Sequence, residues 1–333
     1  ELMSIYIFIF IFFGLLNYFF LKKYIHLSHR LNIISKPKIK DSHKTDKPKG
    51  GGIIFFVMIL LFLIFCFLYN NFKDYYLIYL LALPVISIFS FLDDIYDYKW
   101  FYKLIIDALT IFIIFIFFLY NEEDFIKIDK YYLFYPLIIL SAIWFINLIN
   151  FTDGSDGYLT VFTIYCFTLN LFYGYINYDN LEITKLFFIM IFLIFLYYNK
   201  EPAKLFLGDV GSRLIAVLFL INILYDYIQY HGEALKLWLI ILLPVLLDTG
   251  FTLAQRVIKK KLLSRHRDHA YQILANNFNH NKSIFWMTIN YLIFILPSII
   301  LISFNLINFY FIIIFLIIIL SLQIFYIKIK YYA

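Results

Sequence analysis

Residues 76–97 read YLIYLLALPVISIFSFLDDIYD, an uncharged apolar stretch followed by the acids Asp93, Asp94 and Asp97. About 20 consecutive apolar residues form a helix long enough to cross the hydrocarbon core of a bilayer. The stretch therefore predicts a membrane-spanning helix that carries several carboxylates at one membrane boundary.

The composition of the whole chain extends this prediction. Of the 333 residues, 63% are hydrophobic and only 15% are charged, and the mean hydropathy is +0.83. A soluble core does not need so much apolar surface, so most of it must face lipid or pack inside a helical bundle. We expect an all-α, polytopic integral membrane protein, a single domain over residues 1–333 with about eleven transmembrane helices. The predicted spans are 3–21, 53–69, 76–92, 104–120, 132–149, 158–174, 186–198, 213–228, 236–253, 284–303 and 306–326.

The distribution of positive charge predicts the orientation of these helices. The first stretch is too long for a cleaved signal peptide and lacks a small-residue cleavage site, so it predicts a retained helix. With the N-terminus outside, only five of the 28 lysines and arginines fall in outer segments: Lys73, Lys127, Lys130, Lys185 and Lys236. The remaining lysines and arginines lie in the segments on the opposite side of the membrane, which also carries the C-terminus. Because cytoplasmic loops are rich in Lys and Arg, this side is predicted to be cytoplasmic. The cations flank apolar runs, so the net charge of +6 does not indicate nucleic-acid binding.

Every unusual polar cluster falls in a segment that this orientation makes cytoplasmic. The segments that would build a site are 22–52, 93–103, 147–157, 199–213 and 254–283. The first of them ends in Lys47, Pro48, Lys49 and the glycines 50–52. Such a loop can hold anionic lipid headgroups. Alternatively, its glycine backbone can approach the oxygens of a lipid phosphate or a pyrophosphate.

Asp93 and Asp94 are adjacent carboxylates, which repel each other and are costly to desolvate. A solvated helix end would tolerate them. In a functional site a divalent cation would compensate their repulsion, or one carboxylate would take the proton of a substrate phosphate.

Asn147, Asn150, Asp153 and Asp156 close the fifth predicted span, and each of the two acids precedes a glycine. Turn chemistry explains Asp-Gly pairs. It does not explain two asparagines one helical turn apart in an apolar segment, so this cluster favours a functional turn with several oxygen ligands.

Residues 206–212, FLGDVGS, precede the eighth predicted span. Ser212 is a candidate N-cap, and Asp209 would lie beside exposed backbone N–H groups at a helix N-terminus, an arrangement suited to a magnesium-bound diphosphate.

Asp248 lies within the ninth span, where an unpaired acid is energetically unfavourable. It is either functional or paired with Arg256.

The last inner loop contains RHRDHAYQ at residues 265–272. His266 and His269 could ligate zinc, but no Cys or third His lies near them in sequence. Contacts of His266, Arg267 and His269 with a diphosphate fit this basic loop better.

Taken in order, these motifs resemble the polyprenyl-phosphate N-acetylhexosamine-1-phosphate transferase family, and the resemblance covers nearly the whole chain. The family motifs P-x-x-G-G, D-D-x-x-D, N-x-x-N-x-x-D-G-x-D-G and F-x-G-D-x-G-S are matched at residues 48–52, 93–97, 147–157 and 206–212. The resemblance implies ten or eleven helices around a cytoplasmic cleft in the bacterial inner membrane. It implies transfer of a sugar 1-phosphate from a UDP-N-acetyl sugar to undecaprenyl phosphate with Mg²⁺, or alternatively Mn²⁺, and it leaves room for a homodimer.

The resemblance also implies roles for residues at matching positions. Asp209 and Asp94 would bind the metal, and Asp93 or Asp94 would activate the lipid phosphate; with Asp156 they form the implied catalytic set. The implied substrate-binding residues are Lys47, Lys49, Asn147, Asn150, Asp153, Phe206 (near the uracil), His266, Arg267 and His269.

One departure from the family concerns its last motif, usually R-x-H-x-H-H but here His266-Arg-Asp-His269-Ala-Tyr-Gln. This version is similar to a subgroup that starts bacterial O-antigens with 6-deoxy-hexosamines such as N-acetylfucosamine or N-acetylquinovosamine. It argues against muramoyl-pentapeptide chemistry and leaves UDP-N-acetylglucosamine as an alternative donor.

Two other classes of protein fit the sequence less well. A secondary transporter would place its acids near mid-membrane and show related halves, whereas these acids lie at one boundary and no repeat is visible. A CDP-alcohol phosphotransferase would need D-G-x-x-A-R, and residues 153–156 are not followed by the alanine and arginine of that pattern.

Overall fold

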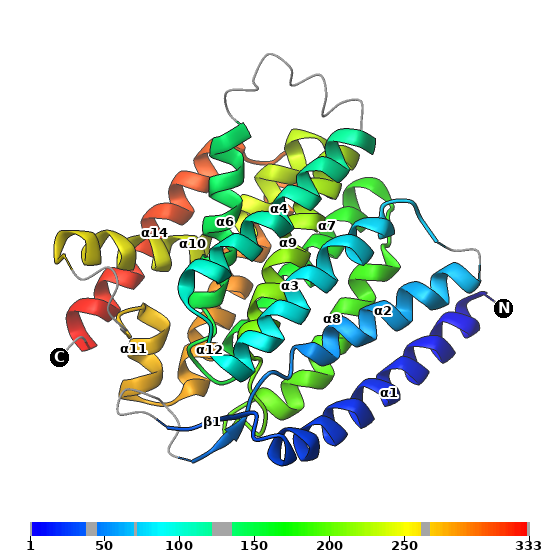
Figure 1. Cartoon of the computed structure of the whole chain (residues 1–333). Coiled ribbons are helices and arrows are strands. Elements are labelled where there is room, and N and C mark those ends of the chain that lie inside the picture. The colour runs from blue at the N-terminus through cyan, green and yellow to red at the C-terminus, as the bar shows by residue number, and fades with distance from the viewer. Residues whose placement is uncertain (1, 38–44, 70–71, 122–134, 261–266, 332–333) are drawn as a thin grey trace. The chain divides into compact units, whose positions relative to one another are not determined.

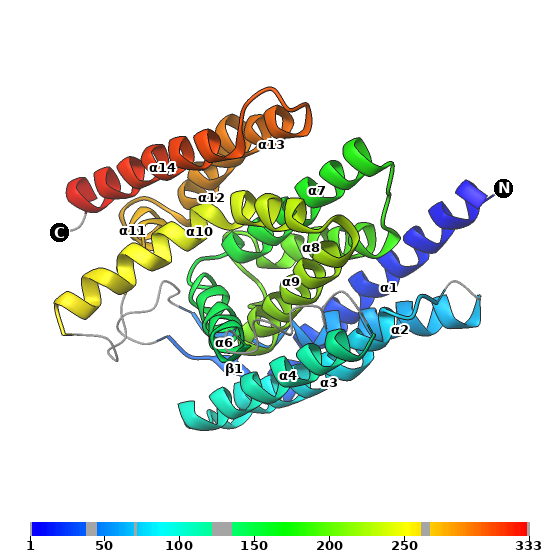
Figure 2. The same ribbon diagram turned by 90° about the horizontal axis from the view of Figure 1, so that it is seen from above.

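The computed structural model describes residues 2–37, 45–69, 72–121, 135–260 and 267–331 (Figures 1 and 2). The described helices are α1 (Leu2–Arg30), α2 (Ile53–Leu68), α3 (Tyr76–Tyr96), α4 (Trp100–Asn121), α6 (Tyr135–Phe151), α7 (Tyr158–Tyr178), α8 (Ile183–Asn199), α9 (Gly208–Tyr230), α10 (Gly232–Ile258), α11 (Ala270–Asn277), α12 (His280–Ile289), the π-helix η2 (Asn290–Ile295), α13 (Leu296–Ser303) and α14 (Phe309–Tyr331). Two short strands, β1 (Ile34–Ser35) and β2 (Lys47–Pro48), pair antiparallel.

The helices confirm an all-α, multi-pass membrane protein. Within the described residues, eight helical segments are long and apolar enough to cross a membrane, and α2, α6 and α8 are shorter apolar helices. Together they cover the eleven predicted stretches, and the number that crosses the bilayer stays a prediction. The predicted span 284–303 is a composite in which η2 joins α12 to α13.

The chain divides into two compact units. Unit 1 comprises Glu1–Asn150, Tyr197–Asn199 and Ala203–Gly232, and unit 2 comprises Phe151–Leu196, Lys200–Pro202 and Glu233–Ala333. In unit 1, α3 packs along α9 and against α4 and α2, and α2 also packs against α1 (Figures 1 and 2). The C-terminal end of α3 lies beside the N-terminal end of α9, and the candidate site forms where these two ends meet.

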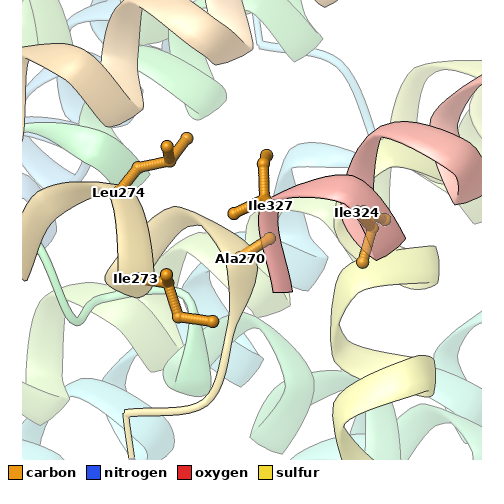
Figure 3. Close-up of a cluster of buried hydrophobic side chains, with 5 residues drawn as sticks. All are labelled: Ala270, Ile273, Leu274, Ile324 and Ile327. Carbon is orange, nitrogen blue, oxygen red and sulfur yellow. The ribbon is translucent and has the colours of Figure 1, made fainter. Parts of the chain in front are cut away.

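In unit 2, the short helix α11 packs against α12 and α14. Figure 3 shows the apolar contact, in which Ala270, Ile273 and Leu274 of α11 meet Ile324 and Ile327 of α14. All five side chains are buried, so apolar burial fixes α11 against the C-terminal helix.

Asp248 of α10 completes the anchoring of α11. Its carboxylate accepts hydrogen bonds from the backbone amides of Ala270 (2.8 Å) and Tyr271 (3.4 Å), and Arg256 pairs with Asp268 at 2.8 Å. The predicted alternative of an Asp248–Arg256 pair is wrong, because the unpaired amides at the start of α11 satisfy the buried carboxylate instead.

The predicted orientation can be tested with single cysteines at opposite ends of α3. Asp74 and Lys99 are both exposed, and the native Cys66 and Cys166 are buried. In intact cells we expect a membrane-impermeant maleimide to label an Asp74→Cys variant and to label Lys99→Cys only after permeabilisation. The reverse pattern would invert the orientation deduced from positive charge.

Candidate active site

The end of α3 fixes Asp93. Asp97 follows α3 with φ 53°, and its N–H donates to the Asp93 carbonyl at 2.8 Å, which closes the helix. The chain then turns back, so that the Tyr98 N–H donates to Asp93 Oδ1 at 2.8 Å. One Asp93 oxygen is thus held by the backbone and the other is left for a neighbouring side chain.

Asp94 binds the first turn of α9. Its two carboxylate oxygens accept hydrogen bonds from the backbone amides of Asp209 and Val210, each at 3.2 Å. A carboxylate is favourable there because the first amides of a helix lack intrahelical partners and carry partial positive charge. The predicted N-cap role of Ser212 is wrong: α9 begins at Gly208, and Asp94 uses the amides that were predicted to face a diphosphate.

Lys103, in the first turns of α4, joins the two remaining acids. Its Nζ lies 2.6 Å from Asp93 Oδ2 and 3.0 Å from Asp209 Oδ2. This shared cation compensates the repulsion between carboxylates that the sequence predicted. The sequence reasoning missed Lys103, although a lysine so close to an apolar stretch was a usable signal.

The five charged groups of this carboxylate–lysine cluster differ in exposure. The side chains of Asp93 and Asp94 are 2% and 5% exposed, whereas that of Asp209 is 33% exposed. Lys49 lies 3.8 Å from Asp94 and, like Lys103, is partly exposed. Asp209 is therefore the acid of this cluster that a ligand can most readily reach, whereas the buried Asp94 already accepts a backbone hydrogen bond on each oxygen.

The glycine loop beside Lys49 is used differently from the prediction. The amides of Gly51 and Gly52 donate to the carbonyls of Phe206 and Leu207, both at 3.0 Å, so they are not open to a phosphate. A Cβ at Gly52 would overlap the backbone of Gly211. The glycines thus allow two backbones to approach closely at the start of α9.

The same pairing places two predicted substrate-binding residues. The Phe206 amide donates to the carbonyl of Pro48 at 2.9 Å, and Lys47 precedes Pro48 in β2. Phe206 and Lys47 are partly exposed. Both residues therefore border the segment that carries Lys49, within unit 1.

A buried polar network lies behind the cluster. Arg213 Nη1 of α9 lies 2.6 Å from Asp107 Oδ1 of α4, and Asn147 Nδ2 of α6 donates to Asp107 Oδ2 at 3.4 Å. Ser212 Oγ donates to Asn150 Oδ1 at 2.5 Å. Both predicted asparagines thus hold α6 against its neighbours. The sequence reasoning missed Asp107, although an acid within an apolar span marked it.

Unit 2 holds the acidic turn, residues 151–157. The Tyr271 hydroxyl donates to the Phe151 carbonyl at 2.7 Å and accepts from the Gly154 amide at 3.1 Å. Burial raises the pKa of Tyr271 well above its usual value, so the phenol stays protonated and can donate. His280 Nδ1 accepts from the Asp156 amide at 2.9 Å. Sequence reasoning gave His280 no role, because nothing in its local pattern marks it.

The basic loop contributes less than predicted among the described residues. His266 lies outside them. Arg267 donates to Asn276 Oδ1 at 3.1 Å, and His269 is 3% exposed at the N-cap position of α11, with its ring 5.8 Å from that of Tyr271. His269 is buried because it starts a packed helix, and its contact with a substrate stays a prediction.

The predicted residues therefore divide between the two units. Unit 1 brings together Asp93, Asp94, Asp209, Lys47, Lys49, Asn147, Asn150 and Phe206. Unit 2 contains Asp153, Asp156, Arg267 and His269.

Replacing Lys103 with Met should lower the rate of the reaction at this site by about 10- to 100-fold. The substitution leaves Asp93 buried beside Asp209 without the cation between them. Lys103→Arg keeps the charge and should retain more activity than Lys103→Met. Wild-type activity of Lys103→Met would show that the charge of Lys103 is dispensable.

These features define a class of protein: a helical, multi-pass membrane protein with carboxylates and lysines gathered where α3 meets α9. Residues 76–226 match the family described as glycosyl transferase family 4. Over these residues, and over the relatives described next, the chain is similar to the polyprenyl-phosphate hexosamine-1-phosphate transferase family.

Curated relatives carry names from this family. The phospho-N-acetylmuramoyl-pentapeptide-transferase of Wolbachia pipientis wMel is 30% identical over 201 residues, which cover 54% of this chain and 61% of that protein. The enzyme of the same name from Listeria monocytogenes serovar 1/2a is 26% identical over 231 residues, 63% of this chain and 68% of that protein. A Bacillus subtilis protein named "Probable undecaprenyl-phosphate N-acetylglucosaminyl 1-phosphate transferase" is 28% identical over 177 residues, 51% of this chain and 48% of that protein. The chain thus covers less than two thirds of the Wolbachia relative.

Proposed function

We propose that this protein transfers a sugar 1-phosphate from a UDP-sugar to undecaprenyl phosphate at the cytoplasmic face of the bacterial inner membrane. A phosphate oxygen of the lipid forms a bond to the β-phosphorus of the UDP-sugar. The bond from that phosphorus to the bridging oxygen breaks, and UMP leaves with the bridging oxygen. The products are undecaprenyl-diphosphate-sugar and UMP.

The observation that supports this proposal most strongly is the carboxylate–lysine cluster. Lys103 and Lys49 lie among three acids from α3 and α9, and Asp209 faces accessible space. Exchange of one phosphoanhydride for another requires positioning and charge stabilisation more than a covalent nucleophile. The partly exposed Lys49 and Lys103 can neutralise a diphosphate, and Asp93 or Asp94 can receive the lipid phosphate proton.

A magnesium ion, or alternatively manganese, fits the donors at this site. Among the described residues, no group of three or more His, Cys, Asp or Glu side chains is arranged to hold a metal. Mg²⁺ needs no such cage, because it is commonly held by one or two carboxylates together with substrate phosphates and water. Asp209 would hold the ion, which when bound would reduce the negative charge of the diphosphate.

For the donor we propose a UDP-N-acetylhexosamine or a 6-deoxy-N-acetylhexosamine, with the product initiating a cell-envelope glycan such as O-antigen. This choice rests on residues 266–272, where Tyr271 stands in the family's histidine motif. Two relatives are named phospho-N-acetylmuramoyl-pentapeptide-transferase, so a comparison of donors with and without the muramoyl-pentapeptide tests this choice directly.

The test mixes the purified protein with Mg²⁺, undecaprenyl phosphate and single UDP-sugars, and follows UMP together with the mass of the lipid product. We expect turnover with UDP-N-acetylglucosamine or a UDP-6-deoxy-N-acetylhexosamine, and none with UDP-N-acetylmuramoyl-pentapeptide. Reactions without the lipid phosphate measure simple hydrolysis, and EDTA tests the need for metal. Turnover of the pentapeptide donor alone would overturn the proposed donor class, and failure of every donor would overturn the transferase activity.

A further inference from the structure

The acidic turn that joins α6 to α7 is contacted by side chains from α11 and α12. Residues 151–157 carry two acids and two glycines, and glycine backbone is permissive. The helices on either side set only the ends of the turn. Side chains that contact the turn from elsewhere in unit 2 therefore bear on the directions of Asp153 and Asp156.

Tyr271 of α11 makes the first such contact. Its hydroxyl bridges two points of the turn, donating to the Phe151 carbonyl at 2.7 Å and accepting from the Gly154 amide at 3.1 Å. The ring is 1% exposed and stacks on Tyr158, with centroids 4.3 Å apart and an interplanar angle of 15°. A rigid, buried phenol thus ties the first half of the turn to α11.

The fit at Gly154 shows how closely the turn approaches α11. A Cβ at this position would lie 2.6 Å from the Tyr271 hydroxyl and would overlap the side-chain amide of Gln272. A larger residue at this position would therefore have to displace the side chains of Tyr271 and Gln272.

His280, the first residue of α12, holds the second half of the turn. A backbone N–H can only donate, so the 2.9 Å bond from the Asp156 amide makes Nδ1 an acceptor and leaves the ring proton on Nε2. The same nitrogen lies 2.9 Å from Ser155 Oγ, which in turn lies 3.3 Å from Ser283 Oγ of α12.

We propose that Tyr271 and His280 are positioning residues that hold the turn 151–157 and thereby aim the carboxylates of Asp153 and Asp156. The proposal rests on the proposed transferase function in assigning those acids to the reaction. Tyr271 fixes the turn before Asp156 and His280 fixes the Asp156 backbone itself, so each removes freedom that the other leaves. A displacement of about 1 Å at a reacting group can cost about 100-fold in rate.

The experiment compares four variants of the full-length protein. Tyr271→Phe keeps the stacked ring and removes both hydrogen bonds, and His280→Ala removes the acceptor. His280→Asn is the conservative variant, because its side-chain oxygen can take the place of Nδ1. Tyr291→Phe is the matched control: Tyr291 is 1% exposed, stacks on Tyr165 and donates its hydroxyl hydrogen bond to the Ile241 carbonyl of α10 at 2.6 Å.

Hydrogen exchange of peptides covering residues 151–157 tests the contacts without requiring activity. We expect Tyr271→Phe and His280→Ala to speed exchange of the Gly154 and Asp156 amides by roughly 5- to 10-fold, as loss of a hydrogen bond predicts. Tyr291→Phe and His280→Asn should leave it near the wild-type rate. Wild-type exchange in both Tyr271→Phe and His280→Ala would overturn the proposal, even if the protein proved to have another activity.

Steady-state transfer kinetics test the consequence of these contacts. Tyr271→Phe and His280→Ala should lower kcat by about 10- to 100-fold with KM changed less than about 3-fold. His280→Asn should recover most of kcat. If Tyr291→Phe lowers kcat as much as Tyr271→Phe, the effect is general destabilisation and the positioning role is wrong.

Discussion

Replacing Asp209 with Asn should lower kcat for sugar-phosphate transfer by roughly 100- to 1000-fold, the size expected for loss of one electrostatic group at a reacting centre. Asp209 is the acid of the cluster whose side chain is most accessible, at 33%. Asn has nearly the same shape but no negative charge, so it binds a divalent cation weakly. The Asp209 amide keeps its bond to Asp94, and Lys103 keeps Asp93 as a partner. The loss should therefore be catalytic and should not come from unfolding.

The measurement is UMP release at saturating substrates, with thermal stability and gel filtration as tests of folding. Asp74→Asn makes the same chemical change at the other end of α3, at an exposed position, and should leave kcat unchanged. Any residual activity of Asp209→Asn should need more Mg²⁺ for half-maximal rate. Activity within about threefold of wild type would show that Asp209 is not a metal-binding residue, because loss of a metal-binding carboxylate should reduce kcat far more.

The helices were predictable because a helix that crosses a membrane appears in the sequence as one continuous apolar stretch. Stretches without charge must be helical in lipid, since every backbone group needs an internal partner there. The π-helix η2 gave no such signal, because an apolar run reads the same whether its hydrogen bonds span four residues or five. The start of α9 was misplaced for a related reason. Its cap comes from Asp94, far away in sequence, and local rules favoured Ser212.

The site was predictable only in part. Asp93, Asp94 and Asp209 stood out as acids beside apolar runs, and the structure brings all three around Lys49 and Lys103. The hydrogen-bond partners of these acids could not be predicted. A sequence motif identifies residue types but does not show which backbone amides lie beside them in the fold. The glycines at 50–52 illustrate this limit: their pattern predicts a phosphate loop, whereas Gly51 and Gly52 pair with the segment before α9.

Tyr271 and His280 show a second limit. Both contact the acidic turn from more than 100 residues away in the chain, with separations of 117 for Gly154–Tyr271 and 124 for Asp156–His280. A single sequence carries no record of such pairings. The sequence did show that residues 266–272 depart from the family pattern. The structure shows that Tyr271, one of the departing residues, donates a hydrogen bond to the Phe151 carbonyl of the acidic turn.

The largest expected effect on stability concerns the buried pair of Asp107 and Arg213. Both side chains are almost fully buried and their charged atoms lie 2.6 Å apart. Arg213→Met leaves Asp107 as a buried carboxylate whose remaining hydrogen-bond donor, among the residues that the structure describes, is Asn147 at 3.4 Å. Removing one partner of a buried ion pair typically costs about 3–5 kcal/mol. We therefore expect Arg213→Met to unfold at a clearly lower temperature than the wild type.

The double variant Asp107→Asn with Arg213→Met separates burial of charge from loss of contact. If the cost comes from the unpaired carboxylate, the double variant should recover most of the stability lost in Arg213→Met, because no charge remains buried. The exposed pair Glu233–Lys236 is the control, and Lys236→Met should cost less than about 1 kcal/mol. Thermal unfolding in one detergent, followed for the wild type, Arg213→Met, the double variant and Lys236→Met, measures these differences in stability. If Arg213→Met is as stable as Lys236→Met, the pair does not hold α4 against α9, and the site above it must be supported by the contacts of Asp94 and Lys103.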